Sequence, residues 1–126
     1  MKRICTFMLS ALALPLSLSA QTTTPPTGYK MVWSDEFNGT SLNTKVWNIE
    51  ENGNGGGNQE LQYYRKENVA VANGNLVLTA RRENYNNKQF TSGRINSRDK
   101  AYFKHGIIQA RIKFPKTANG VWPAYW

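Results

Sequence analysis

The sequence predicts an all-β fold of the sandwich or barrel type. Apolar and polar residues alternate with period two over Ile107–Phe114 and again over Asn75–Arg81, which is typical of strands with one buried face. Short segments of this kind are separated by turns rich in Asn and Gly, and Asn73-Gly74 is a strong signal for a two-residue hairpin turn. No window shows the periodicity of an amphipathic helix. Together these observations indicate an all-β architecture.

Residues 1–20 have the three parts of a secretory signal peptide. A basic start at Lys2-Arg3 is followed by the apolar run Ile4–Leu18, and small residues precede an expected cleavage site after Ala20. The apolar run is short and contains Ser and Pro, so it does not predict a membrane span. We therefore expect a secreted or periplasmic protein with no membrane partner. Cleavage would remove Cys5, the only cysteine, and a single cysteine excludes a disulfide scaffold.

Residues 21–28 read as a polar linker, and residues 29–126 belong to at most one domain. We expect Trp33, Phe37 and Trp47 in its core. The last apolar pattern runs to the final residue without a turn or polar tail, and all-β domains commonly reach about 200–250 residues. We therefore expect the chain to be part of a longer domain. In chain order, the expected strands are Lys30–Phe37, Val46–Ile49, Leu61–Tyr64, Val69–Ala72, Asn75–Arg81, Phe90–Asn96, Lys100–Phe103, Ile107–Phe114 and Val121–Trp126.

The segment Gly55–Tyr64 combines aromatic side chains with amides and a carboxylate, which suits a neutral sugar. The C–H face of a pyranose rests on an aromatic ring, and planar amides or carboxylates pair with neighbouring hydroxyls. In an extended conformation Asn58, Glu60 and Gln62 share one face. The same pattern also fits a solvated face after a flexible glycine loop, and periodicity alone does not separate the two interpretations.

The carboxylates of this chain do not predict a catalytic pair. Glycoside hydrolysis needs two carboxyl groups about 5–9.5 Å apart, and on one strand face such residues stand two or four positions apart. None of the eight Asp and Glu residues has such a partner, since Asp35-Glu36 and Glu50-Glu51 are adjacent and point to opposite faces. We therefore assign no catalytic residue here. The single histidine, His105, excludes a multi-histidine metal site.

The chain is basic, with 16 Lys and Arg against 8 Asp and Glu and a net charge of +8. Such a charge raises the alternative of an anionic partner, either nucleic acid or a sulfated polysaccharide. The positive residues are scattered, and no run is longer than two. A chain that lacks part of its domain can also carry a skewed charge. We therefore expect no nucleic acid partner.

Six motifs in order resemble the N-terminal half of a glycoside hydrolase family 16 domain of the laminarinase, or endo-β-1,3-glucanase, type. Each motif alone is weak, whereas the order and spacing of all six are specific. The resemblance covers roughly residues 28–126. The motifs are Val32–Gly39 (VWSDEFNG), Gly57–Tyr64 (GNQELQYY), Asn75–Ala80 (NLVLTA), Thr91–Ile95 (TSGRI), Gly106 with Gln109–Lys113 (QARIK), and Asn119–Trp126 (NGVWPAYW).

The resemblance implies a concanavalin-like jelly-roll β-sandwich, present here as its N-terminal part, with a sugar-binding cleft. It implies a secreted enzyme that cleaves β-1,3 or mixed β-1,3/1,4 glucan by a retaining mechanism and is a monomer when complete. The family's two catalytic glutamates lie in a Glu-X-Asp-X-X-Glu strand that follows the Trp-Pro-Ala-Phe/Tyr-Trp motif, and this chain has no such pattern. We therefore expect the chain alone to be inactive. Two alternatives stay open: a lectin-like, non-catalytic binding sandwich, and a family 16 agarase or carrageenase.

By position, five residues resemble sugar-binding residues of the family. Asn58 follows the glycine-rich loop, Arg94 stands in the TSGRI motif, Asn119 precedes the last motif's aromatic residues, and Trp122 and Trp126 correspond to tryptophans that wall the cleft. The rigid fork of an arginine suits a pair of sugar hydroxyls.

The resemblance also implies part of a structural calcium site. Glu36 and the backbone carbonyl of Gly74 correspond to two of its positions, which the family completes with an aspartate near the C-terminus. Calcium takes six to eight oxygen ligands, so two positions cannot hold it firmly. We expect calcium, if bound in the complete domain, to be structural, and no cofactor to be required.

Overall fold

The computed structural model describes residues 24–116 and 120–126. The chain divides into two compact units, with the boundary between Trp33 and Ser34. In residues 24–33 the backbone makes a turn, closed by a hydrogen bond from Tyr29 N to Pro26 O (3.0 Å), and forms no strand. The expected signal peptide and residues 21–23 of the linker lie outside the described residues, so both stay predictions.

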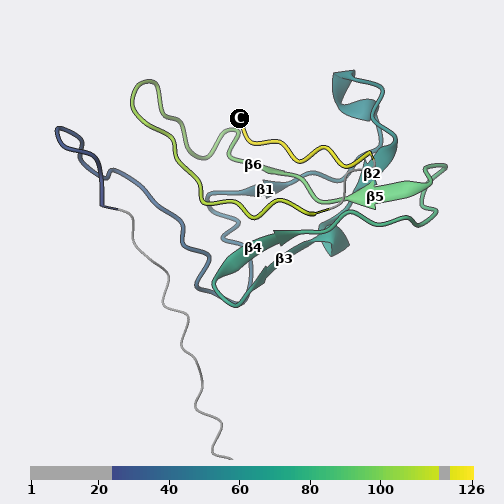
Figure 1. Ribbon diagram of the computed structural model, residues 1–126. Helices are drawn as coiled ribbons and strands as arrows, with labels where there is room; N and C mark the ends of the chain where they lie inside the picture. Colours follow the sequence, from purple (N-terminus) through teal and green to yellow (C-terminus); the bar gives the residue numbers. More distant parts are fainter. Residues whose placement is uncertain (1–23, 117–119) are drawn as a thin grey trace, which may run out of the picture. The chain divides into compact units, whose positions relative to one another are not determined.

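Three pairs of short strands form in the second unit (Figure 1). Its described helical segments are two single-turn 3-10 helices, η1 (Gly55–Gly57) and η2 (Lys66–Asn68). No helix in the described part of the chain has the length and apolar character that a membrane crossing requires. The strands confirm the predicted all-β character. β1 (Asn48–Ile49) pairs antiparallel with β6 (Ile95–Asn96), β3 (Val69–Ala72) antiparallel with β4 (Asn75–Leu78), and β2 (Gln62–Tyr64) parallel with β5 (Phe90–Ser92).

The β3–β4 hairpin confirms the turn predicted at Asn73-Gly74. Both turn residues are left-handed, with φ of 51° and 69°, as a two-residue turn of type I′ requires. The register runs from the pair Val69 and Leu78 to the pair Ala72 and Asn75. The alternation over Asn75–Arg81 predicts that one face of this strand, which carries Leu76, Leu78 and Ala80, is buried. This expectation is wrong for Leu78, which is 47% exposed.

A second tight turn lies at Tyr85–Lys88, which the sequence did not predict. Tyr85 and Lys88 exchange backbone hydrogen bonds of 2.9 Å around Asn86 (φ 42°) and Asn87 (φ 62°). Asparagine tolerates left-handed φ better than most residues, so the Asn-Asn pair was the available signal.

The core of the described chain is small and largely polar. The buried side chains are those of Asn68 and Thr91, each 1% exposed, and Val71, 8% exposed. Asn68 Nδ2 donates to Thr79 O (2.7 Å) and to Thr91 Oγ1 (3.0 Å), and Thr79 N donates back to Asn68 O (2.9 Å). Asn68 therefore ties together the start of β3, the residue after β4 and the centre of β5.

Several sequence expectations are wrong. Phe90–Asn96 is not one strand but two, interrupted at Gly93, where a Cβ would lie 2.5 Å from Asn68 O. Trp33 is exposed rather than in the core, while Phe37 and Trp47 are half-buried and stack with ring centroids 6.2 Å apart. Four expected strands are irregular in the structure: Lys30–Phe37, Lys100–Phe103, Ile107–Phe114 and Val121–Trp126.

These segments share a physical reason for remaining irregular. A strand exists only through hydrogen bonds to a neighbouring strand, and no described segment pairs with any of them. Many of their large apolar side chains consequently stay exposed, as Ile108 shows with an exposed fraction of 69%.

Candidate functional site

The β1–β6 pair brings together Glu50 and Arg94, which lie far apart in the sequence. Glu50 follows β1 and Arg94 precedes β6, and Glu50 N donates to Arg94 O (2.9 Å). The two half-buried side chains form an ion pair, with Arg94 Nε 3.3 Å from Glu50 Oε1. An arginine paired through Nε keeps a planar fork of two Nη groups for other partners.

Two asparagine amides hold the Glu50 carboxylate. Asn96 Nδ2 donates to Glu50 Oε1 (2.8 Å), and Asn52 Nδ2 makes a longer hydrogen bond to Glu50 Oε2 (3.5 Å). Asn96 is itself oriented by a hydrogen bond from Asn48 Nδ2 to its Oδ1 (3.1 Å). Both carboxylate oxygens therefore have a donor besides the arginine.

Arg94 also lies near two aromatic rings. Its guanidinium carbon is 5.4 Å from the centre of the Tyr64 ring and 5.0 Å from the centre of the Trp126 ring, within range of a cation–π interaction. Trp126 is 86% exposed. A flat, exposed ring beside an arginine fork can stack against a sugar while the fork donates to its hydroxyls.

The Tyr64 hydroxyl belongs to a second set of hydrogen bonds. Tyr64 donates to Glu60 Oε2 (2.6 Å), and Gln62 Nε2 donates both to Glu60 Oε2 (3.1 Å) and to the Tyr64 oxygen (2.9 Å). Burial raises the pKa of Tyr64 above 10.0, and the hydrogen bond to Glu60 raises that pKa further. The phenol therefore stays a neutral donor. We call the whole set the Arg94 cluster: Glu50, Asn52, Glu60, Gln62, Tyr64, Arg94, Asn96 and Trp126.

The structure brings together two of the five predicted sugar-binding residues, Arg94 and Trp126. Trp122 is 92% exposed, and its ring contacts no other described ring. Asn58 is exposed at the end of η1. The left-handed φ of Gln59 (58°) breaks the extended face on which Asn58 was expected to lie with Glu60. Asn119 lies outside the described residues.

The sequence prediction missed four members of the cluster. Glu50 and Asn52 stand two residues apart, as do Arg94 and Asn96, so each pair shares a strand face. That spacing was the available signal, but it does not predict that the face with Glu50 and Asn52 contacts the face with Arg94 and Asn96. Tyr64 likewise extends the face of Glu60 and Gln62, which the structure does place together.

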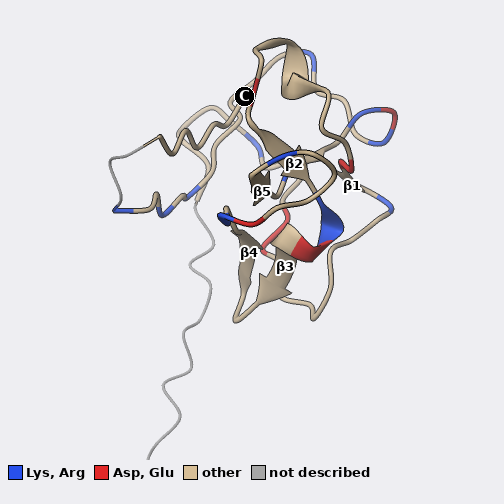
Figure 2. Cartoon of the chain, turned by 90° about the vertical axis from the view of Figure 1, so that its right-hand side faces the viewer, with Lys and Arg blue, Asp and Glu red and all other residues tan. Residues whose placement is uncertain are grey.

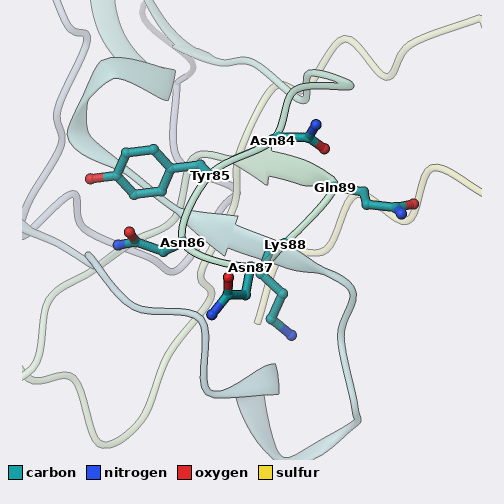
Figure 3. A pocket seen from close by; sticks show the side chains of 6 residues that line it. All are labelled: Asn84, Tyr85, Asn86, Asn87, Lys88 and Gln89. Atoms are coloured by element: carbon teal, nitrogen blue, oxygen red, sulfur yellow. The ribbon is translucent and has the colours of Figure 1, made fainter.

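A hollow of about 380 Å³ lies on the loop around the Asn86-Asn87 turn. One of its lining residues, Lys88, reaches the Arg94 cluster, where its Nζ donates to Glu60 O (3.0 Å). All six lining residues, Asn84 to Gln89, come from this loop, and Figure 3 shows Tyr85 and Gln89 pointing to opposite sides of it. Tyr85 packs inward, where its ring lies 3.9 Å from the Arg65 guanidinium carbon and 5.0 Å from the Tyr63 ring. The hollow is the surface of one turn and holds no converging polar groups from other elements.

The predicted calcium positions do not form a complete site among the described residues. Asn38 Oδ1 lies 3.6 Å from the place that a Cβ on Gly74 would take, so the segment after Glu36 does approach the β3–β4 turn. No group of three or more Asp, Glu, His or Cys gathers in the described part of the chain. Because calcium takes six to eight oxygens, these residues alone do not fit it, and calcium binding stays a prediction.

Charge is distributed over the chain rather than collected on one element. Figure 2 shows Lys and Arg on several separate segments, with Asp and Glu among them. The ion pairs of Arg65 with Glu83 (3.4 Å) and of Arg94 with Glu50 neutralise two of the half-buried arginines locally.

Comparison with known proteins finds relatives whose names refer to β-glucan or laminarin. The model of the family described as "Beta-glucan synthesis-associated protein SKN1/KRE6/Sbg1" matches residues 8–126. The β-glucanase of Rhodothermus marinus is 38% identical over 130 residues, which cover 100% of this chain and 45% of that protein. Among solved structures, the Rhodothermus marinus laminarinase is 45% identical with a TM-score of 0.52, over 57% of this chain and 30% of that one. The laminarinase catalytic domain of Thermotoga petrophila is 39% identical with a TM-score of 0.57, over 61% of this chain and 34% of that one.

These relatives confirm the predicted jelly-roll class and the laminarinase resemblance. The chain spans less than half the length of the curated β-glucanase and about a third of the solved laminarinases. The name of the matching family refers to glucan synthesis, whereas these relatives are named as hydrolases, and β-glucan is common to both descriptions. The chain belongs to the SKN1/KRE6/Sbg1 family, and its sequence and fold are those of the N-terminal part of a glycoside hydrolase family 16 laminarinase domain.

Proposed function

We propose that this chain is the N-terminal, sugar-binding part of a secreted enzyme that hydrolyses β-1,3 or mixed β-1,3/1,4 glucan with retention of configuration. The observation that carries the proposal is the Arg94 cluster, in which Trp126 and a half-buried arginine lie beside each other. Relatives named as β-glucanase and laminarinase support the substrate class. Export rests on the leader pattern of residues 1–20.

The chemistry of the cluster suits an uncharged sugar. The exposed Trp126 ring offers a flat apolar surface, and the Arg94 fork and the amides around it offer donors for hydroxyl groups. In this proposal Asn58, Asn119 and Trp122 extend the same cleft in the complete domain. These three assignments come from the family resemblance.

Catalysis needs a pair of carboxyl groups on either side of the scissile bond. In the described chain Glu50 is engaged with Arg94 and two amides, and Glu60 with Tyr64 and Gln62. The chain spans about a third of the solved laminarinases. We therefore assign the catalytic pair to sequence that this chain does not contain.

The experiment compares the full-length protein that the gene encodes with residues 21–126 alone. The full-length protein should release reducing sugar from laminarin, and proton NMR of the first products should show the β-anomer that retention predicts. Residues 21–126 should release none. A first product of inverted configuration would refute the retaining mechanism. Hydrolysis by purified 21–126 that is lost on changing Glu50 or Glu60 to Gln would refute the assignment of catalysis.

A non-catalytic binding sandwich is the second candidate, because the exposed Trp126 ring and the Arg94 donors would bind a sugar whether or not it is cleaved. The same experiment separates the two. Full-length protein that binds laminarin without cleaving it would support the binding module.

A further inference from the structure

The positive charge of the half-buried Arg94 guanidinium is already paired with the negative charge of Glu50. Glu50 Oε1 lies 3.3 Å from Arg94 Nε, and the second carboxylate oxygen accepts from Asn52. The other groups around the arginine carry no positive charge. Tyr64 and Trp126 present rings, and Asn96 donates to Glu50.

This arrangement has consequences for an anionic ligand. A free guanidinium pairs readily with oxyanions such as sulfate esters, through two parallel hydrogen bonds. Here a sulfate bound to the Arg94 guanidinium would lie close to the Glu50 carboxylate, which is paired with the same guanidinium. The two negative charges would repel each other at this short distance. A hydroxyl group carries no such penalty and can accept from the Nη groups.

From this geometry we propose that Glu50 is a specificity-determining residue: its carboxylate positions Arg94 and cancels its charge, so that the cluster accepts an uncharged glucan and disfavours a sulfated polysaccharide. The proposal rests on the proposed sugar-binding function of the Arg94 cluster. It also gives a chain with a net charge of +8 a locally charge-matched pair at the proposed sugar-binding residues.

The test measures binding of two probes by calorimetry to the full-length protein that the gene encodes. The neutral probe is laminarihexaose, and the sulfated probe is a κ-carrageenan hexasaccharide. Glu50→Gln replaces the carboxylate by an amide of nearly the same shape, which removes the charge. Glu51→Gln is the matched control, because it makes the same change at the adjacent, exposed position.

Glu50→Gln should weaken laminarihexaose binding by about tenfold, since the Arg94 donor loses the carboxylate that positions it. The same variant should bind the sulfated probe roughly two- to fivefold tighter, the effect of unpairing a partly exposed charge. This gain should vanish in about 1 M NaCl, where the Debye length falls to about 3 Å. A residue needed only for folding would lower affinity for both probes, so the opposite signs identify the specificity role.

Glu50→Asp is a second variant, because the shorter side chain keeps the charge but draws it back from Arg94. It should weaken laminarihexaose binding without a gain for the sulfated probe. The proposal is overturned if Glu50→Gln and Glu50→Asp both match Glu51→Gln with both probes. Wild-type protein that does not bind laminarihexaose would instead contradict the proposed function, while the sulfated probe still reports on charge cancellation by Glu50.

Discussion

The segments Asn75–Arg81 and Ile107–Phe114 carry the same alternation of apolar and polar side chains, yet only the first contains a regular strand, β4 of the β3–β4 hairpin. In the hairpin a two-residue turn returns the chain on itself, so each strand finds its partner within a few residues. Ile107–Phe114 pairs with no described strand, and Ile108 and Phe114 lie exposed. The comparison shows that alternation specifies which face of a strand is apolar, whereas pairing decides whether the strand forms.

The largest expected effect concerns folding of the chain in isolation. We predict that residues 21–126 expressed alone are insoluble or molten, because unpaired strands and uncovered apolar faces favour aggregation. Circular dichroism and hydrogen exchange should show no cooperative melting and weak protection at Ile107–Phe114. The full-length protein should protect this segment as well as β3–β4. A sharp thermal transition of soluble, monomeric 21–126 would contradict the prediction.

A smaller loss of stability is expected from a change in the polar core, where Asn68 connects the paired strands. Asn68→Ala removes both hydrogen bonds of a buried amide, so it should lower the free energy of unfolding of the full-length protein by about 2–3 kcal/mol. Urea denaturation measures this change. Asn84→Ala, at an exposed position, is the control and should stay within about 0.5 kcal/mol of wild type. Equal midpoints for the two variants would show that Asn68 is not a structural centre.

Arg94→Ala tests the contact between Arg94, next to strand β6, and the Trp126 ring. It should weaken laminarin binding of the full-length enzyme by about 1–3 kcal/mol, because the cluster loses its charged donor. Trp122→Ala should raise KM or lower turnover through the loss of a stacking surface. Steady-state kinetics on laminarin measure both, with Arg98→Ala as an exposed control on the same stretch of chain. Wild-type kinetics in both variants would make the cleft assignment wrong.

The smallest effect is a dependence of stability on alkaline pH. The pKa of Tyr64 is raised in the folded state, so its contribution to stability is complete below pH 10.0 and is lost as pH rises through the raised pKa. The thermal midpoint of Tyr64→Phe should therefore fall less steeply than that of wild type above pH 10. Tyr102, whose pKa the Asp99 hydrogen bond raises at the surface, provides the comparison variant Tyr102→Phe. Parallel slopes for wild type and Tyr64→Phe would contradict the assigned burial of the Tyr64 hydroxyl.

Local features of this protein were readable because short segments of sequence specify them. Asn73-Gly74 supplies two residues that accept left-handed φ, and the turn they form sets the register of β3 and β4 without help from distant residues. The class of fold and the choice of Arg94 and Trp126 came from motifs whose order along the chain is itself sequence information.

Tertiary structure alone decided which of these residues meet. Glu50 reaches Arg94 because β1 pairs with β6, and Asn68 becomes a core residue because the ends of β3, β4 and β5 converge on its amide. No local pattern encodes either contact, since each depends on closing a long loop of chain and on hydrogen bonds made at its far end. The same dependence on distant residues explains why some predicted strands formed and others did not. One segment alone can show alternation, but a strand also needs a second segment to which it is hydrogen-bonded.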